Sequence, residues 1–181
     1  MSTPVSLRTL AVLGLLGLLL SGCATQPPAS MPTPAQFADA FAYCRAVGNV
    51  DAPDARFTGP KVPETIVTGL MRAMKMSPDA PVEPFTRLTV WRCMGGKVVG
   101  CSIGANIPCS TKADVGRTAS AGMNEFCTAN ANSDNIPAAV TGRATIYQWR
   151  CTNGSPAIVK ELTKPDAQGF LAMFWYEVGA Q

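Results

Sequence analysis

The cysteines are the residues of this chain most able to form covalent bonds or bind metals. The 181 residues include seven cysteines and no histidine. Cysteine sulfur forms disulfides, binds soft metals or acts as a nucleophile. The missing histidine removes Ser-His-Asp and Cys-His catalysis and every histidine-ligated metal site. The chemistry left to consider is disulfide formation, covalent modification of a thiol, and acid–base work by some of the 12 carboxylates.

The first cysteine, Cys23, follows a segment typical of exported proteins. Arg8 is the one charged side chain in residues 1–9, and residues 10–20 form an unbroken apolar run, LAVLGLLGLLL. A helix of this length rises about 16 Å, so it cannot span a hydrocarbon core of about 30 Å. We predict a signal peptide over residues 1–22.

The residues Leu20-Ser21-Gly22-Cys23 resemble the lipobox of bacterial lipoproteins. The resemblance implies that Cys23 receives diacylglycerol, that the chain is cut before it, and that its new amine is acylated with a fatty acid such as palmitate. Ala24, rather than aspartate, follows the cysteine; by resemblance to Gram-negative lipoproteins this implies the outer membrane, facing the periplasm. The alternative is an ordinary signal peptide in which Cys23 merely follows small residues.

Residues 23–34 are expected to be a lipidated tether. Residues 24–34 contain four prolines and no charge, which favours an extended chain with a reach of roughly 35 Å. A lead-in of no particular length is the alternative. Residues 35–181 are long enough for a single folded domain. The net charge of +3 gives no support for nucleic-acid binding.

Two parts of this domain repeat one sequence pattern. Residues 43–59 and 126–142 align without a gap and share seven identities, including Cys44 with Cys127 and Asp51 with Asp134. The sequence Trp-Arg-Cys followed by a glycine turn also occurs twice, at residues 91–96 and 149–154. We predict a tandem duplication, with related units over about residues 35–104 and 118–162.

The six cysteines after Cys23 are an even number in an exported chain, which favours three disulfides. The predicted units each contain two equivalent cysteines, so pairing within units gives Cys44–Cys93 and Cys127–Cys151 and leaves Cys101–Cys109. Exchange of partners between units is the alternative. No Cys-x₂₋₄-Cys pair supports a zinc site, and we expect neither a metal nor a cofactor.

Two elements repeated in the sequence have both a functional and a structural interpretation. Trp91 and Trp149, with Trp175, would suit an aromatic platform for a sugar or a peptide, but strand alternation places the first two beside a cysteine and favours the core. Arg92 and Arg150 lie on the opposite strand face and are expected in solvent. An ion pair between the units, Arg92–Asp134 or Arg150–Asp51, is a speculative alternative.

Turn signals and apolar spacing predict the elements that position these residues. Helices are expected over residues 34–47, 64–76 and 120–130, the first capped by Thr33. Glycine turns at residues 95–96 and 153–154 predict hairpins with strands over 87–93, 97–102, 144–151 and 157–162. The aromatic residues 170–178 predict a last strand. The predicted fold is α+β, an antiparallel sheet of hairpins with flanking helices and disulfide staples.

These patterns favour a non-enzymatic binding or structural module anchored in the cell envelope, with an envelope protein or the cell wall as partner. The body of the chain resembles uncharacterised cysteine-rich exported bacterial proteins, which implies no activity. One alternative is an inhibitor of a lytic enzyme, because membrane-bound lysozyme inhibitors are also small, disulfide-stapled and lipidated. The other is an enzyme that processes an envelope polymer with paired carboxylates.

Overall fold

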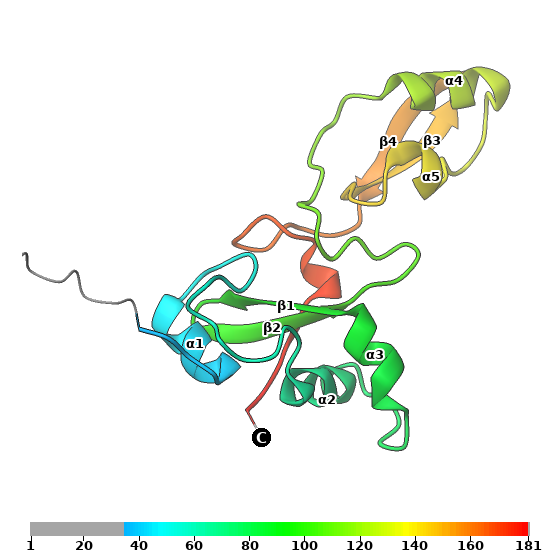
Figure 1. Cartoon of the computed structure of the whole chain (residues 1–181). Helices are drawn as coiled ribbons and strands as arrows, with labels where there is room; N and C mark the ends of the chain where they lie inside the picture. Colours follow the sequence, from blue (N-terminus) through cyan, green and yellow to red (C-terminus); the bar gives the residue numbers. More distant parts are fainter. Residues whose placement is uncertain (1–34, 181) are drawn as a thin grey trace, which may run out of the picture. The chain divides into compact units, whose positions relative to one another are not determined.

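The computed structural model describes residues 35–180 and confirms the α+β class (Figure 1). Along this part of the chain, groups of helices alternate with antiparallel hairpins. In this part of the chain no helix is long and apolar enough to span a membrane. The helices are α1 (Ala40–Val47), α2 (Glu64–Ala73), α3 (Val82–Leu88), α4 (Ala121–Ala129) and α5 (Ala138–Thr141), and the strands are β1 (Thr89–Met94), β2 (Lys97–Ser102), β3 (Tyr147–Thr152), β4 (Ser155–Glu161) and β5 (Tyr176–Glu177).

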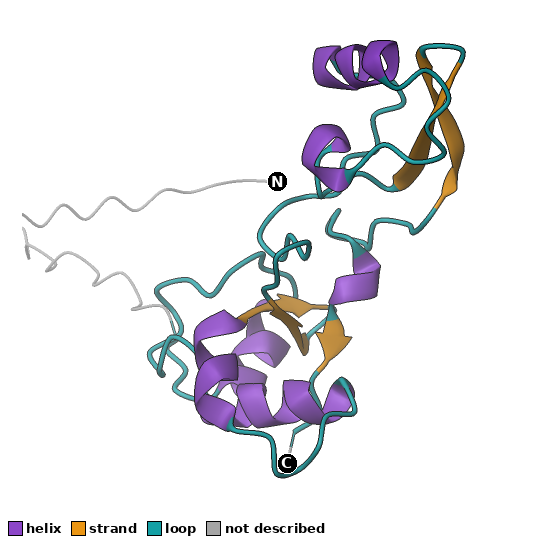
Figure 2. Ribbon diagram, turned by 90° about the vertical axis from the view of Figure 1, so that its right-hand side faces the viewer, coloured by secondary structure: helices purple, strands orange, loops and turns teal. Residues whose placement is uncertain are grey.

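The strands form two separate sheets, drawn in orange in Figure 2. One sheet has the order β1-β2-β5 and the other consists of β3 and β4. Both predicted hairpins are present, and their turns need residues that tolerate positive φ: Gly95 and Gly96 in the first, Asn153 and Gly154 in the second. The hairpin turns therefore fix the register of both pairs.

Helix α1 starts later than predicted. The side chain of Asp39 accepts a hydrogen bond of 2.7 Å from the Ala42 N–H and caps the helix. Phe37 instead forms a parallel bridge with Phe57, which keeps the residues before the cap extended. The predicted cap, Thr33, lies outside the described residues.

Helix α3 was not predicted, and it takes the residues assigned to the start of the first strand. Pro81 precedes the helix, and the hydroxyls of Thr86 and Thr89 donate to carbonyls four residues earlier. The predicted last strand is also wrong for most of its length. Residues 172–174 form a 3₁₀ turn, and only Tyr176–Glu177 pair with β2.

Each sheet belongs to its own hydrophobic core. The first core is formed by residues of α1, α2, β1 and β2, among them Tyr43 and Trp91. The second is formed mainly by residues of α4 and β3, among them Met123 and Trp149. We call the two groups of elements the first and second lobes. The core placement predicted for the two tryptophans is confirmed, because Trp91 is 3% exposed and Trp149 is 5% exposed.

The six cysteines are paired within the lobes, as the repeat suggested. The disulfides are Cys44–Cys93, Cys127–Cys151 and Cys101–Cys109, and all six residues are buried.

Aligned residues of the two lobes also make matching contacts with their hairpin turns. Asn49 accepts a hydrogen bond from the Gly95 N–H, and Asn132 accepts one from the Asn153 N–H. The duplication itself stays a prediction, and these contacts are what it would explain.

Candidate functional site

A cavity of about 660 Å³ lies beside β1 in the first lobe, and we call it the edge groove. Its size falls in the range of small-molecule and peptide sites. Four distant parts of the chain line it. They contribute residues 51–54, Phe57, Gly59, Lys61 and Val62 from the first part, Thr89, Val90 and Trp91 from β1, Cys109, Ser110 and Lys112 from the third part, and Phe170 and Trp175 from the fourth.

The groove follows the backbone edge of β1. Thr89, Val90 and Trp91 are consecutive, yet all three border the same cavity. Side chains of consecutive strand residues point to opposite faces, so one cavity touches all three only if it runs along the edge. The other edge of β1 is occupied by β2, which pairs with it in antiparallel register.

Aromatic side chains form a wall of the groove on each face of β1. On one face the rings of Phe57 and Trp91 meet edge to face, with centroids 4.9 Å apart; we call this pair the Trp91 wall. On the face of Arg92, the rings of Phe170 and Trp175 have centroids 5.5 Å apart, and we call this pair the Trp175 wall. A ligand in the groove would contact apolar rings on both sides.

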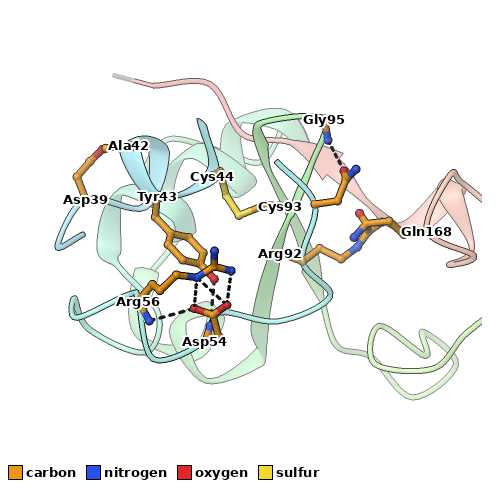
Figure 3. The surroundings of a disulfide bond; sticks show 11 residues. Asp39, Ala42, Tyr43, Cys44, Asp54, Arg56, Arg92, Cys93, Gly95 and Gln168 are labelled. Atoms are coloured by element: carbon orange, nitrogen blue, oxygen red, sulfur yellow. Dashed lines mark hydrogen bonds and ion pairs between the residues drawn. A yellow bond between two sulfur atoms is a disulfide. The ribbon is translucent and has the colours of Figure 1, made fainter. Parts of the chain in front are cut away.

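The Trp175 wall is held in place by the buried guanidinium of Arg92. The carbon Cζ of Arg92 lies 4.4 Å from the centroid of Phe170 and 4.2 Å from that of Trp175. The same guanidinium donates to the carboxylate of Asp166 and the side-chain oxygen of Gln168. Figure 3 shows Cys93 directed toward Cys44, whereas the Arg92 side chain extends toward Gln168.

This ion pair is removed from water. The side chain of Arg92 is 0% exposed and that of Asp166 is 7% exposed. Burial lowers the pKa of the Arg92 guanidinium from its ordinary value, and the carboxylate of Asp166 opposes that shift. The Arg92 Nε has no hydrogen-bond partner within the described residues. Arg92 therefore positions the aromatic wall and is closed off from ligand.

Gln168 extends the network to the rim of the groove. Its Nε2 donates to the carboxylate of Asp51 at 3.0 Å. The Lys112 ammonium donates to that carboxylate at 2.6 Å and to the Gln168 carbonyl at 2.5 Å. It also lies 3.8 Å from the centroid of Phe170. These contacts join three distant segments of the chain at one side of the groove.

The two repeated arginines have different surroundings. Arg150 is solvent-exposed, as predicted, and pairs with Asp134 at 3.1 Å. The prediction of an exposed side chain is wrong for Arg92, because the segment around Asp166 covers it. The speculative ion pairs between the units are also wrong, since each arginine has another partner. Only the first lobe has its arginine enclosed by the C-terminal segment.

A second ion pair joins Asp54, which lines the groove, to Arg56. The carboxylate of Asp54 accepts hydrogen bonds from the backbone and guanidinium of Arg56, the shortest at 2.5 Å. These bonds lower the pKa of Asp54 to about 2, with side-chain hydrogen bonding to Arg56 as the largest cause. Asp54 therefore stays ionised at neutral pH and does not serve as a proton donor.

We predict that the Asp54 carboxyl titrates with a midpoint near 2 in a carbon-detected NMR titration. Its folded pKa lies below the unfolded value of about 3.9, so the pair stabilises the fold above about pH 4. That contribution is lost as the pH falls through the folded pKa. Arg56→Gln should return the midpoint toward the ordinary value. An unchanged midpoint in this variant would assign the shift to another cause.

The structure gathers some of the residues discussed from the sequence and separates others. It brings Trp91, Trp175 and Asp51 to the edge groove, whereas Trp149 borders a second cavity, of about 390 Å³, in the second lobe. Sequence reasoning missed Phe57 and the other groove residues. The sequence does contain one signal for Phe57: the first unit has an aromatic residue at this position, whereas the aligned position of the second unit holds Val140.

No three histidine, cysteine, aspartate or glutamate side chains within residues 35–180 are grouped as metal ligands would be. The groove instead offers aromatic faces, paired charges at its rims and a strand edge. Comparison with protein-family models, with curated proteins and with solved structures finds no match to this chain.

Proposed function

We propose that the protein is a lipid-anchored binding module of the bacterial cell envelope that holds a partner in the edge groove. The observation that carries the binding role is the groove itself, a cavity of about 660 Å³ with an aromatic wall on each face of β1. Largely apolar pockets with a few fixed polar groups are the usual form of binding sites. The anchor is proposed from the lipobox residues, which lie outside the described residues.

The charges in the groove favour binding over polymer cleavage by paired carboxylates. Such a mechanism needs one carboxyl group that is protonated near neutral pH and one that is ionised. Asp54 is held ionised by Arg56, and Asp51 is engaged by Lys112 and Gln168. These pairs are suited to shaping the rims of a binding site.

Replacement of Cys23 tests the anchor. In the native bacterium, Cys23→Ala should abolish incorporation of labelled palmitate, because the proposed attachment atom is lost. Acyl chains bind membranes with about 0.8 kcal/mol per buried CH₂, so their loss removes the attachment. The matched control replaces Cys101 and Cys109 with alanine, which should leave labelling unchanged. Persistent label on the Cys23→Ala chain would contradict the lipid anchor.

Photo-crosslinking in cells tests the binding role. A benzophenone amino acid is placed at position 111, where Thr111 is exposed and lies between the groove residues Ser110 and Lys112, or at position 118 as a control. We expect a discrete adduct from position 111 alone, and Ala52→Phe, which fills the groove, should abolish it. Equal adducts from both positions, or none from position 111, would contradict a role for the groove.

A further inference from the structure

The edge of β1 is left without a partner at Trp91. Val50 and Cys93 exchange two backbone hydrogen bonds of 3.1 Å on the side away from β2. In an antiparallel strand every second residue directs both its N–H and its C=O to the same side. Trp91 therefore directs these groups to the same edge as Cys93, and no described residue binds either of them.

In the second lobe the chain itself supplies a partner for the carbonyl at the equivalent position. There the Ile136 N–H donates to the carbonyl of Trp149 at 2.9 Å, and the Cys151 N–H donates to Ser133. In the gap-free alignment of the repeats, Ile136 corresponds to Pro53. Proline has no N–H, so the first lobe lacks the donor that binds this carbonyl in the second.

Buried backbone groups almost always have a hydrogen-bond partner, and Trp91 is only 3% exposed. Its open edge also lies between the Trp91 wall and the Trp175 wall. A strand added at this edge would direct alternate side chains to opposite faces, one set toward each wall. The cavity thus has the geometry of a site for an extended chain.

The charge on the groove indicates one further property of the occupant. The other charged side chains that line it are paired, Asp51 with Lys112 and Asp54 with Arg56. Lys61 is exposed, and its ammonium makes no ion pair or hydrogen bond with the described part of the chain. An acidic group on the ligand would complement it.

We propose that the edge groove binds an extended segment of a partner polypeptide by strand addition to β1 at Trp91. Alternate apolar side chains of the segment contact the two aromatic walls, and an acidic side chain near one end lies beside Lys61. Main-chain hydrogen bonds supply affinity in this mode, and the side-chain contacts supply specificity. The inference rests on the binding role proposed above and names its ligand class.

Selection from a library of random seven-residue peptides tests this inference. The bait is the purified mature chain with Cys23→Ser. Ser110→Phe fills the groove, and Thr111→Phe adds the same ring to the neighbouring exposed residue, which does not line the groove. Circular dichroism melts of both variants verify folding. We expect peptides with alternating apolar residues and a terminal acidic residue, retained at least tenfold better by Thr111→Phe than by Ser110→Phe.

Two measurements on the best peptide separate strand addition from general apolar binding. Methylation of the backbone nitrogen that faces Trp91 should weaken binding about tenfold, because one hydrogen bond is lost. Hydrogen exchange should show the Trp91 amide unprotected in the free protein and protected in the complex. Lys61→Glu should shift the selection from acidic to basic peptides.

Failure of this inference is distinguishable from failure of the binding role. No enrichment over Ser110→Phe, or equal binding of the methylated peptide, would overturn strand addition. A Trp91 amide that is already protected in the free protein would also overturn it. If the cellular crosslink from position 111 then attaches to a glycan, the binding role stands and the peptide ligand is wrong.

Discussion

Replacing Arg92 with methionine is expected to lower the free energy of unfolding by about 3–5 kcal/mol, because a buried carboxylate loses its cation. Asp166, only 7% exposed, would be left without the guanidinium that it faces. The two rings of the Trp175 wall would also lose the group between them. Urea unfolding monitored by circular dichroism measures the change.

Arg150 provides the matched control, since it occupies the aligned position in the second lobe. Its ion pair with Asp134 is exposed, so Arg150→Met should cost only about 0.2–1 kcal/mol. A second variant, Arg92→Met with Asp166→Leu, should recover part of the loss, because it removes the unpaired charge. Equal effects of Arg92→Met and Arg150→Met would contradict the importance of burial.

Removal of the Cys44–Cys93 disulfide should have the largest effect among the three disulfides. The chain-entropy relation gives about 4 kcal/mol for its separation of 49 residues, about 3.5 for the 24 of Cys127–Cys151 and about 2.5 for the 8 of Cys101–Cys109. The bridge also links α1 to β1 within the first core. Paired Cys→Ala variants measured by urea unfolding would rank the three.

The expected order of the three stability losses follows loop length, and the variant that lacks the shortest loop checks it directly. Cys101→Ala with Cys109→Ala should retain the most stability and a cooperative transition. A larger loss there than in the Cys44–Cys93 variant would show that packing around the short loop outweighs the entropy of the unfolded chain.

Short-range signals predicted the hairpins because their cause is local. The turns at Gly95 and Asn153 need positive φ, and that requirement is visible in the residue types. The start of α1 was missed because its cap competes with the pairing of Phe37 and Phe57, residues 20 apart in the chain. The strand expected over residues 170–178 is interrupted by the 3₁₀ turn at residues 172–174; Phe170 and Leu171 form bridges with Lys112 and Pro165 before that turn, and Tyr176 and Glu177 pair with β2 after it.

The candidate site was less predictable than the fold, because its walls come from segments that are distant in the sequence. Strand alternation correctly placed Trp91 in the core and Arg92 on the other face. It gave no indication that Asp166 and Trp175 would cover Arg92, since nothing in the neighbouring residues of β1 encodes that contact. The missing donor to the Trp91 carbonyl coincides with Pro53, and this residue stands out only when the two lobes are compared.

The way the first lobe is closed has a consequence for biogenesis. Its sheet receives β5, and its buried arginine receives Asp166, so residues 166–177 complete a lobe whose first helix, α1, starts at Ala40. A polypeptide that emerges from its N-terminal end, during synthesis or translocation, must therefore hold this lobe unfinished until residues 166–177 have appeared. Until then the edge of β2 and the charge of Arg92 are open to folding factors. Premature termination after β4 would leave both permanently exposed, and such a chain would be a substrate for quality-control proteolysis.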